Sequence, residues 1–254
     1  MTDLTARAGG ENNRRRGGPP PAKLMPQFPG GIVDPESYIE PAFIMPAEPA
    51  VIDPATLFDR SAPIAVELGS GKGRFVIDAA IRRPEMNFIA VEYVNKYFKT
   101  IVSRAAHRGL SNVRVVRDDA RHFIIDALPD ASIAECHIYH PDPWPKTRHH
   151  KRRLVRPRFL LALHRVLAPG GLLVFQTDHN ELWDYSLRAI RHYFNATVLD
   201  APWPDAPLGR TNYEIKALQA GWTVNRLTAT PRTDPPDAAK TETLERQLES
   251  KGEE

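Results

Sequence analysis

The chain has 254 residues, a formal net charge of +3 and a single cysteine, Cys136. This length suits one α/β domain with extensions, and a lone cysteine excludes an internal disulfide and favours a reducing compartment. Because no apolar run approaches the ~20 residues of a membrane span and no secretory signal opens the chain, we expect a cytoplasmic protein without a membrane segment.

The two ends of the chain differ in composition from its centre. Residues 1–31 are rich in Arg, Pro and Gly, and we predict that they are disordered because such a composition buries no core. Residues 32–231 form the predicted folded domain, which opens on a proline-interrupted lead-in. Residues 232–254 are polar and charged, and we expect a flexible tail with at most a frayed helix near residues 244–248.

From residue 64 onward, short apolar strands alternate with amphipathic helices. The first five strands are predicted at residues 64–68, 87–92, 113–117, 133–139 and 172–177. The helices that follow these strands are predicted at residues 75–81, 95–108, 120–128, 159–167 and 181–193. Two more strands, near residue 198 and at 222–230, end the fold, with a loop carrying residues 211–214 between them. This alternation predicts a mainly parallel central sheet with helices on both faces, a Rossmann-like α/β fold.

Acidic residues lie at the ends of four predicted strands, where an open parallel sheet binds its ligands. They are Glu67, Glu92, Asp119 and Asp142. Glu67 opens a turn containing Gly69 and Gly71, but the dinucleotide fingerprint would need a glycine where this chain has Arg74. An acid inside the turn would repel a pyrophosphate, so the ligand there is expected to have a cationic end. With Glu92 on a ribose and Asp119 near an adenine, the pattern describes S-adenosylmethionine.

The segment from His140 to Arg153 reads HPDPWPKTRHHKRR. Prolines on both sides of Asp142 stiffen the backbone there, and Trp144 is expected either to stack on a base or to pack within the loop. Basic residues then accumulate, and no acid follows Asp142 until Asp178. This unrelieved positive charge favours contact with a phosphate chain over a merely solvated face.

Together these motifs resemble those of the tRNA (guanine-N7-)-methyltransferases. The matching stretches lie at residues 67–73, 91–92, 119–120, 141–153, 177–178 and 211–214, and the resemblance spans about residues 55–230. It implies a class I S-adenosylmethionine-dependent methyltransferase fold and methylation of guanine N7 in the variable loop of tRNA. The expected partner is tRNA, and we expect a monomer or homodimer with no obligatory protein partner and no metal.

The resemblance also implies roles for individual residues. Asp142 is the expected catalytic residue. The expected cofactor-binding residues are Glu67, Gly69, Gly71, Glu92, Asp119 and Asp142. The expected substrate-binding residues are Lys146, Arg152, Arg153, Asp178, Thr211, Asn212, Tyr213 and Glu214. Without the resemblance, residues 211–214 would be interpreted as a helix N-cap with a reciprocal glutamate, and both interpretations can hold.

Three other functions fit parts of the pattern. One is a different S-adenosylmethionine-dependent methyltransferase that acts on RNA or on amino groups. A nicotinamide oxidoreductase is disfavoured by Arg74 and by Glu67 inside the turn. A non-catalytic RNA-binding module is disfavoured because RNA binding gains nothing from four carboxylates around one pocket.

Overall fold

The computed structural model of the protein describes residues 51–250, without the side chains of residues 249 and 250. The predicted disorder of residues 1–31 and the first part of the predicted lead-in lie outside these residues. No helix within the described range is long and apolar enough to cross a bilayer. Residue 53 caps a short 3-10 helix, η1 (Pro54–Leu57), and Phe58 after it is buried in the core.

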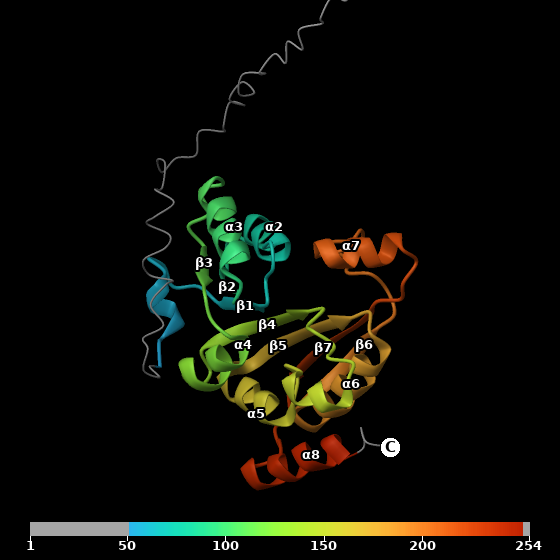
Figure 1. Ribbon diagram of the computed structural model, residues 1–254. Helices are drawn as coiled ribbons and strands as arrows, with labels where there is room; N and C mark the ends of the chain where they lie inside the picture. The colour runs from blue at the N-terminus through green and yellow to red at the C-terminus, as the bar shows by residue number, and fades with distance from the viewer. Residues whose placement is uncertain (1–50, 251–254) are drawn as a thin grey trace, which may run out of the picture. The chain divides into compact units, whose positions relative to one another are not determined.

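A sheet of seven strands runs through the described part of the chain (Figure 1). The strands are β1 (Ile64–Leu68), β2 (Asn87–Val91), β3 (Val113–Val116), β4 (Ile133–Tyr139), β5 (Leu167–Thr177), β6 (Phe194–Leu199) and β7 (Asn225–Pro231). Their order in space is β3-β2-β1-β4-β5-β7-β6. β1 to β5 pair in parallel, whereas β7 is antiparallel to both β5 and β6. The predicted Rossmann-like, mainly parallel sheet is confirmed.

Helices cover both faces of this sheet. They are α2 (Arg74–Arg82), α3 (Asn95–Ala106), α4 (Ala120–His122), the π-helical turn η2 (Phe123–Ala127), the 3-10 helix η3 (Thr147–Arg152), α5 (Pro157–Val166), α6 (Asn180–Tyr193), α7 (Asn212–Gln219) and α8 (Ala238–Ser250). Figure 1 shows α2 and α3 on one side of the sheet, and α5 and α6 on the other. Each side has its own apolar cluster, which is why β1 is buried along its whole length.

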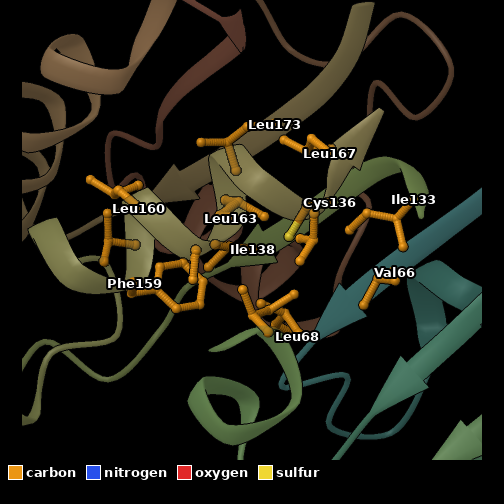
Figure 2. Close-up of a cluster of buried hydrophobic side chains, with 14 of the residues drawn as sticks. Val66, Leu68, Ile133, Cys136, Ile138, Phe159, Leu160, Leu163, Leu167 and Leu173 are labelled. Carbon is orange, nitrogen blue, oxygen red and sulfur yellow. The ribbon is translucent and has the colours of Figure 1, made fainter. Parts of the chain in front are cut away.

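The larger apolar cluster joins α5 to the centre of the sheet (Figure 2). Phe159 and Leu163 of α5 lie beside Ile138 of β4, and Val66 of β1 belongs to the same cluster. Cys136 lies in the same cluster, and burial raises the pKa of its thiol far above the usual range. The cysteine is therefore a small core residue, and the site must be built from other groups.

The end of α7 explains why the last strand starts later than predicted. The N–H of Gly221 donates to the Leu218 carbonyl and the N–H of Trp222 donates to the Ala217 carbonyl, while Gly221 has a φ of +75°. This pattern closes a helix with a left-handed glycine. Residues 220–222 therefore belong to the helix end, and β7 begins at Asn225.

The prediction of a flexible tail is wrong for residues 238–250, which form α8 against α5 (Figure 1). Glu245 lies 2.5 Å from the Arg156 guanidinium and accepts from the Arg158 N–H. The hydroxyl of Tyr193 donates to Thr241, and Leu244 and Leu248 pack against the core. A helix this short is marginal by itself in water, so these tertiary contacts stabilise a segment whose own pattern is weak.

We predict that the double variant Leu244→Ala with Leu248→Ala lowers the free energy of unfolding by about 2 kcal/mol, because partly buried leucine side chains lose their packing against α5. Urea unfolding of the full chain measures the change. Glu242→Ala, at an exposed position of the same helix, is the matched control. Equal free energies of unfolding for the double variant and the wild type would contradict a stabilising role of the α8 contacts.

Candidate active site

The site lies where the order of the strands reverses, between the carboxyl ends of β1 and β4. Two adjoining pockets open there and share Gly69, Gly71, Tyr139 and His140. The first, here called the Asp142 pocket, has a volume of about 490 Å³ and is also lined by Glu92, Asp119, Asp142, Trp144 and Arg152. The second, the Glu67 pocket, has a volume of about 720 Å³ and is also lined by Glu67, Thr211, Asn212, Tyr213 and Lys216. The acids predicted to bind the cofactor and residues 211–213, predicted to bind the substrate, thus line one continuous cleft.

The glycine turn after β1 leaves room for a ligand. Gly69 and Gly71 have φ values of +73° and +54°, which favour glycine. A Cβ atom on either would meet nothing within 4 Å, so the space beside them is open. At Gly73, in contrast, a Cβ atom would lie 2.8 Å from the Ile101 side chain of α3. The first two glycines therefore face the cleft, and the third allows close packing of α2 and α3.

Glu67 is buried at the end of β1 and has a free acceptor atom. Its Oε2 has no hydrogen-bond partner among the described residues, which is rare for a buried polar atom. Burial raises the pKa of Glu67 to about 8, although hydrogen bonds from Ser70 and from the Val76 N–H act in the opposite direction. The site thus holds an acid that is largely protonated at neutral pH and that would ionise beside a cationic ligand.

Glu92 and Asp119 are held by backbone donors. Glu92 accepts from the N–H groups of Gly71 and Val94, each at 2.7 Å, and so ties the glycine turn to the end of β2. Asp119 caps α4 by accepting from the Arg121 N–H at 2.8 Å. Carboxylate oxygens retain further lone pairs beyond such bonds. Both acids can therefore accept from ligand hydroxyl or amino groups while keeping their places in the wall.

Asp142 sits on a loop whose conformation is held from both ends. His140 and Trp144 both have left-handed φ values, +49° and +45°, which cost energy in residues other than glycine. At the first end, the His140 N–H donates to the Gln176 carbonyl of β5. At the second, the Pro143 carbonyl accepts from the Arg153 guanidinium at 2.9 Å. Asp142 itself is exposed and has no hydrogen-bond or ion-pair partner among residues 51–250, so its carboxylate is available to a ligand.

The prediction that Arg153 binds the substrate is wrong. Its side chain is 1% exposed, and it pairs with Glu181 of α6 at 2.7 Å and lies over the Tyr185 ring. A buried guanidinium needs such partners because leaving water is costly for a charge. Arg153 therefore fastens the Asp142 loop to α6 and cannot reach a phosphate.

The remaining basic residues of this segment are exposed. Lys146, Arg148, Lys151 and Arg152 all lie at the surface. Desolvation and these neighbouring positive charges lower the pKa of His149. The Arg152 guanidinium lies 4.9 Å from the Trp144 ring, and both line the Asp142 pocket. Trp144 thus packs within its loop and still faces the cleft, as the two interpretations of this residue allowed.

The predicted loop at residues 211–214 is the first turn of α7. Thr211 is its N-cap and accepts from the Glu214 N–H at 3.0 Å. Glu214 reaches back to the Arg210 N–H at 2.6 Å and pairs with Arg226 of β7 at 2.8 Å. Its side chain is fully buried and does not line the pocket, which differs from the substrate contact predicted for Glu214. The capping interpretation is confirmed for Thr211, whereas Glu214 accepts from the Arg210 N–H, one residue before the N-cap.

Asp178, just after β5, is joined to the wall of the Glu67 pocket. Its carboxylate lies 2.9 Å from Nδ1 of His140, and burial together with the nearby negative charge of Asp178 raises the pKa of the Tyr213 hydroxyl. His140 and Tyr213 both line the pocket. His140 and Tyr97 line both pockets but were not predicted as site residues. For His140, its place beside the proline-framed Asp142 was the available signal.

Glu67→Gln should stabilise the ligand-free protein at alkaline pH. The folded-state pKa of about 8 lies above the ordinary value of 4.5, so between these values the wild type loses stability as pH rises. The glutamine variant escapes this loss, and we expect an advantage on the order of a few kcal/mol at pH 8 and none near pH 4.5. Thermal unfolding across this range measures it, with the exposed Glu85→Gln as control. If the stabilities of wild type and variant changed with pH in parallel, the raised pKa of Glu67 would be contradicted.

Comparison with known proteins gives a consistent result. Residues 61–227 match the protein family described as "Putative methyltransferase". A curated protein of Geobacter metallireducens named tRNA (guanine-N(7)-)-methyltransferase is 42% identical over 142 residues, which cover 56% of this chain and 67% of the relative. Proteins of the same name from Bordetella pertussis (37% identity, 70% of each chain) and Nitrosomonas eutropha (34% identity, 74% of this chain and 84% of the relative) match longer stretches.

Solved structures agree on the fold. The 16S rRNA methyltransferase KamB superposes with a TM-score of 0.51 at 17% identity, covering 68% of this chain and 88% of that one. At this identity the likeness concerns the fold alone. It places the chain among the class I methyltransferase folds, in agreement with the sheet order and with the glycine turn after β1.

Proposed function

The chain belongs to the tRNA (guanine-N(7)-)-methyltransferase family, and from this we propose that it methylates N7 of a guanine in the variable loop of tRNA. S-adenosylmethionine is the methyl donor. The observation that carries the proposal is the continuous cleft formed by two adjoining pockets, one lined by Glu67 and the other by Asp142, with exposed cations nearby in the sequence. We further propose that the enzyme works in the cytoplasm, as a monomer or homodimer, without an obligatory protein partner.

The residues at the cleft fit the cofactor. S-adenosylmethionine supplies a methyl group made electrophilic by its sulfonium. The free Oε2 of Glu67 suits the ammonium of its amino acid end, because a buried acceptor needs a donor. Gly69 and Gly71 leave open space along the backbone, Glu92 can accept from ribose hydroxyls, and Asp119 lies where the adenine amino group would be met.

Asp142 is the proposed catalytic residue. Guanine N7 already carries a free lone pair, so the reaction needs alignment and placement of charge rather than removal of a proton from N7. An Asp142 carboxylate can accept from the N1–H and amino group of guanine, whereas the N1 of adenine is itself an acceptor. The same negative charge favours the positive charge that develops on the methylated base. The two prolines and Arg153 hold this carboxylate toward the cleft.

The proposed guanine site has a second wall. Thr211, Asn212 and Tyr213 line the Glu67 pocket, and Asp178 is hydrogen-bonded to His140 of the same wall. We propose that Asp178 and these α7 residues orient the guanine, and that Lys146 and Arg152 contact the RNA backbone. Their exposure and charge suit phosphate binding. Arg153 and Glu214, being buried, hold this wall together instead.

The first experiment is methyl transfer from labelled S-adenosylmethionine to unmodified tRNA, with the product nucleosides identified. We expect N7-methylguanosine in the variable loop. Methylation of an exocyclic amine or of another RNA would replace this function by another methyltransferase activity. Cofactor binding without transfer to any RNA would favour a non-catalytic RNA-binding module.

We predict that Asp142→Ala lowers kcat/KM on the order of 100-fold or more, because the charge near the developing cation and the acceptor for the base edge are both lost. Binding of S-adenosylmethionine, measured by calorimetry, should change little, since the cofactor keeps its contacts at the Glu67 end. Asp126→Ala, a change in η2 away from both pockets, is the control. Wild-type turnover by Asp142→Ala would remove the aspartate from the mechanism.

Arg152→Ala and Arg153→Ala should have opposite signatures although the residues are adjacent. The exposed Arg152 is expected to contribute a phosphate contact, so its loss weakens tRNA binding and reduces the slope of log K against log salt by about one. Removal of the buried Arg153 takes the guanidinium donor from the Pro143 carbonyl and leaves Glu181 with His150 as its only ion-pair partner among the described residues, and should lower the free energy of unfolding by about 2 kcal/mol. Salt titrations of tRNA binding and urea unfolding of both variants distinguish the two roles. Similar behaviour of the two variants in both measurements would contradict the assignment.

A further inference from the structure

A buried series of polar side chains connects the loop before α7 to the proposed guanine site. The Trp203 indole nitrogen lies 2.5 Å from Oε1 of Gln176, and Nε2 of Gln176 lies 2.9 Å from Nε2 of His140. Nδ1 of His140 in turn lies 2.9 Å from Oδ1 of Asp178. Trp203 and Gln176 are almost fully buried, and the His140 side chain is 5% exposed. Water therefore has little access to these bonds.

The chemistry of these groups allows only one direction for the hydrogen bonds. An indole N–H can only donate, so the atom of Gln176 that faces Trp203 must be the amide oxygen. The amide NH2 group of Gln176 then faces His140 and donates to Nε2, which must be unprotonated. A neutral imidazole has one N–H, and that proton must be on Nδ1, where it is donated to Asp178. Trp203 thus determines the tautomer of His140, which lies two hydrogen bonds away.

The surroundings of His140 are compatible with a neutral ring. Burial lowers the pKa of His140, and the hydrogen bond and negative charge of Asp178 only partly oppose this effect. Glu214 of α7 also acts to raise this pKa, and Arg226 of β7 acts to lower it. The Tyr213 ring lies 4.8 Å from the imidazole, and burial together with the nearby negative charge of Asp178 raises the pKa of its hydroxyl. His140 and Tyr213 therefore both lie beside the Asp178 carboxylate.

We propose that Trp203, Gln176 and His140 form a one-directional series of hydrogen bonds that fixes the Asp178 carboxylate in the guanine site, with His140 as a positioning residue. The role rests on the proposed function, since it is Asp178 and Tyr213 that would meet the base. His140 also starts the Asp142 loop, at a left-handed φ of +49°. One side chain thus places Asp178 while its backbone leads into Asp142, so the two acids keep a fixed relation across the cleft.

The tautomer can be measured without any substrate. In the full chain with 15N-labelled histidine, NMR correlations of the imidazole nitrogens at pH 7.5 should show His140 with a protonated Nδ1 and an unprotonated Nε2. Gln176→Glu places a carboxylate, which only accepts, against Nε2, and should draw a second proton onto the ring and raise the His140 pKa. Trp203→Phe removes the donor that orients the Gln176 amide. The amide can then flip, and His140 should show a mixture of tautomers. Trp222→Phe, which changes an exposed tryptophan, is the matched control and should leave the His140 signals unchanged.

The positioning role is tested by two variants at His140. Asparagine carries an amide N–H near the place of Nδ1 and tolerates a left-handed φ, whereas glutamine reaches only toward the place of Nε2. We expect His140→Asn to keep kcat/KM for tRNA within about threefold of wild type and His140→Gln to lower it about tenfold, the range expected for a hydrogen bond to a charged group. Binding of S-adenosylmethionine should be unchanged in both, and thermal unfolding monitors their folding.

Each outcome decides a separate part of the proposal. A wild-type His140 with its proton on Nε2, or with both nitrogens protonated at pH 7.5, would overturn the series itself. The predicted tautomer combined with equal activity of the two His140 variants would overturn the positioning role. If the tautomer is as predicted but the wild-type chain transfers no methyl group to tRNA, the proposed function fails, and with it the assignment to guanine, while the hydrogen-bond order remains.

Discussion

The site depends first on the buried guanidinium of Arg153. The loop that carries Asp142 contains prolines that cannot donate backbone hydrogen bonds, so it cannot hold its own shape by a regular ladder. Arg153 supplies the missing contact by donating to the Pro143 carbonyl and to Glu181 of α6. Because a buried charge tolerates little displacement from its partners, the loop, η3 and α6 form one unit. The place of Asp142 therefore depends on a residue that is buried among protein groups.

The carboxylates of the cleft can coexist because each is in a different environment. Glu67 is buried and has a raised pKa, to which the nearby Glu92 charge contributes. Glu92 accepts from two backbone N–H groups, and Asp178 is hydrogen-bonded to His140. Asp142 is the exposed one. Repulsion between like charges in a low dielectric is strong, so protonation of the first acid and hydrogen bonding of the next two make this arrangement possible.

Strands were predictable from sequence, whereas the inward or outward direction of single polar residues was not. The strands Ile64–Leu68 and Ile133–Tyr139 agree with the predicted limits residue for residue, because apolar runs bounded by turn residues determine them. Arg152 and Arg153 are identical in type and adjacent, and only the end of η3 directs one outward and the other into the core. Helix α8 was missed since its stability comes from contacts with α5 rather than from its own pattern.

The position of the acid with the shifted pKa fits a reaction in which no proton has to leave N7. A strongly shifted pKa in a cleft commonly marks a general acid or base, and here the shifted acid is Glu67, at the proposed ammonium end of the cofactor. The proposed catalytic acid, Asp142, is exposed and lines the adjoining pocket. A ring nitrogen with a free lone pair attacks without deprotonation, so guanine needs no buried general base. In the proposed mechanism, the buried Glu67 serves cofactor binding, and the rigid placement of Asp142 serves to orient the guanine. Prolines, a buried arginine and a series of directed hydrogen bonds provide that placement.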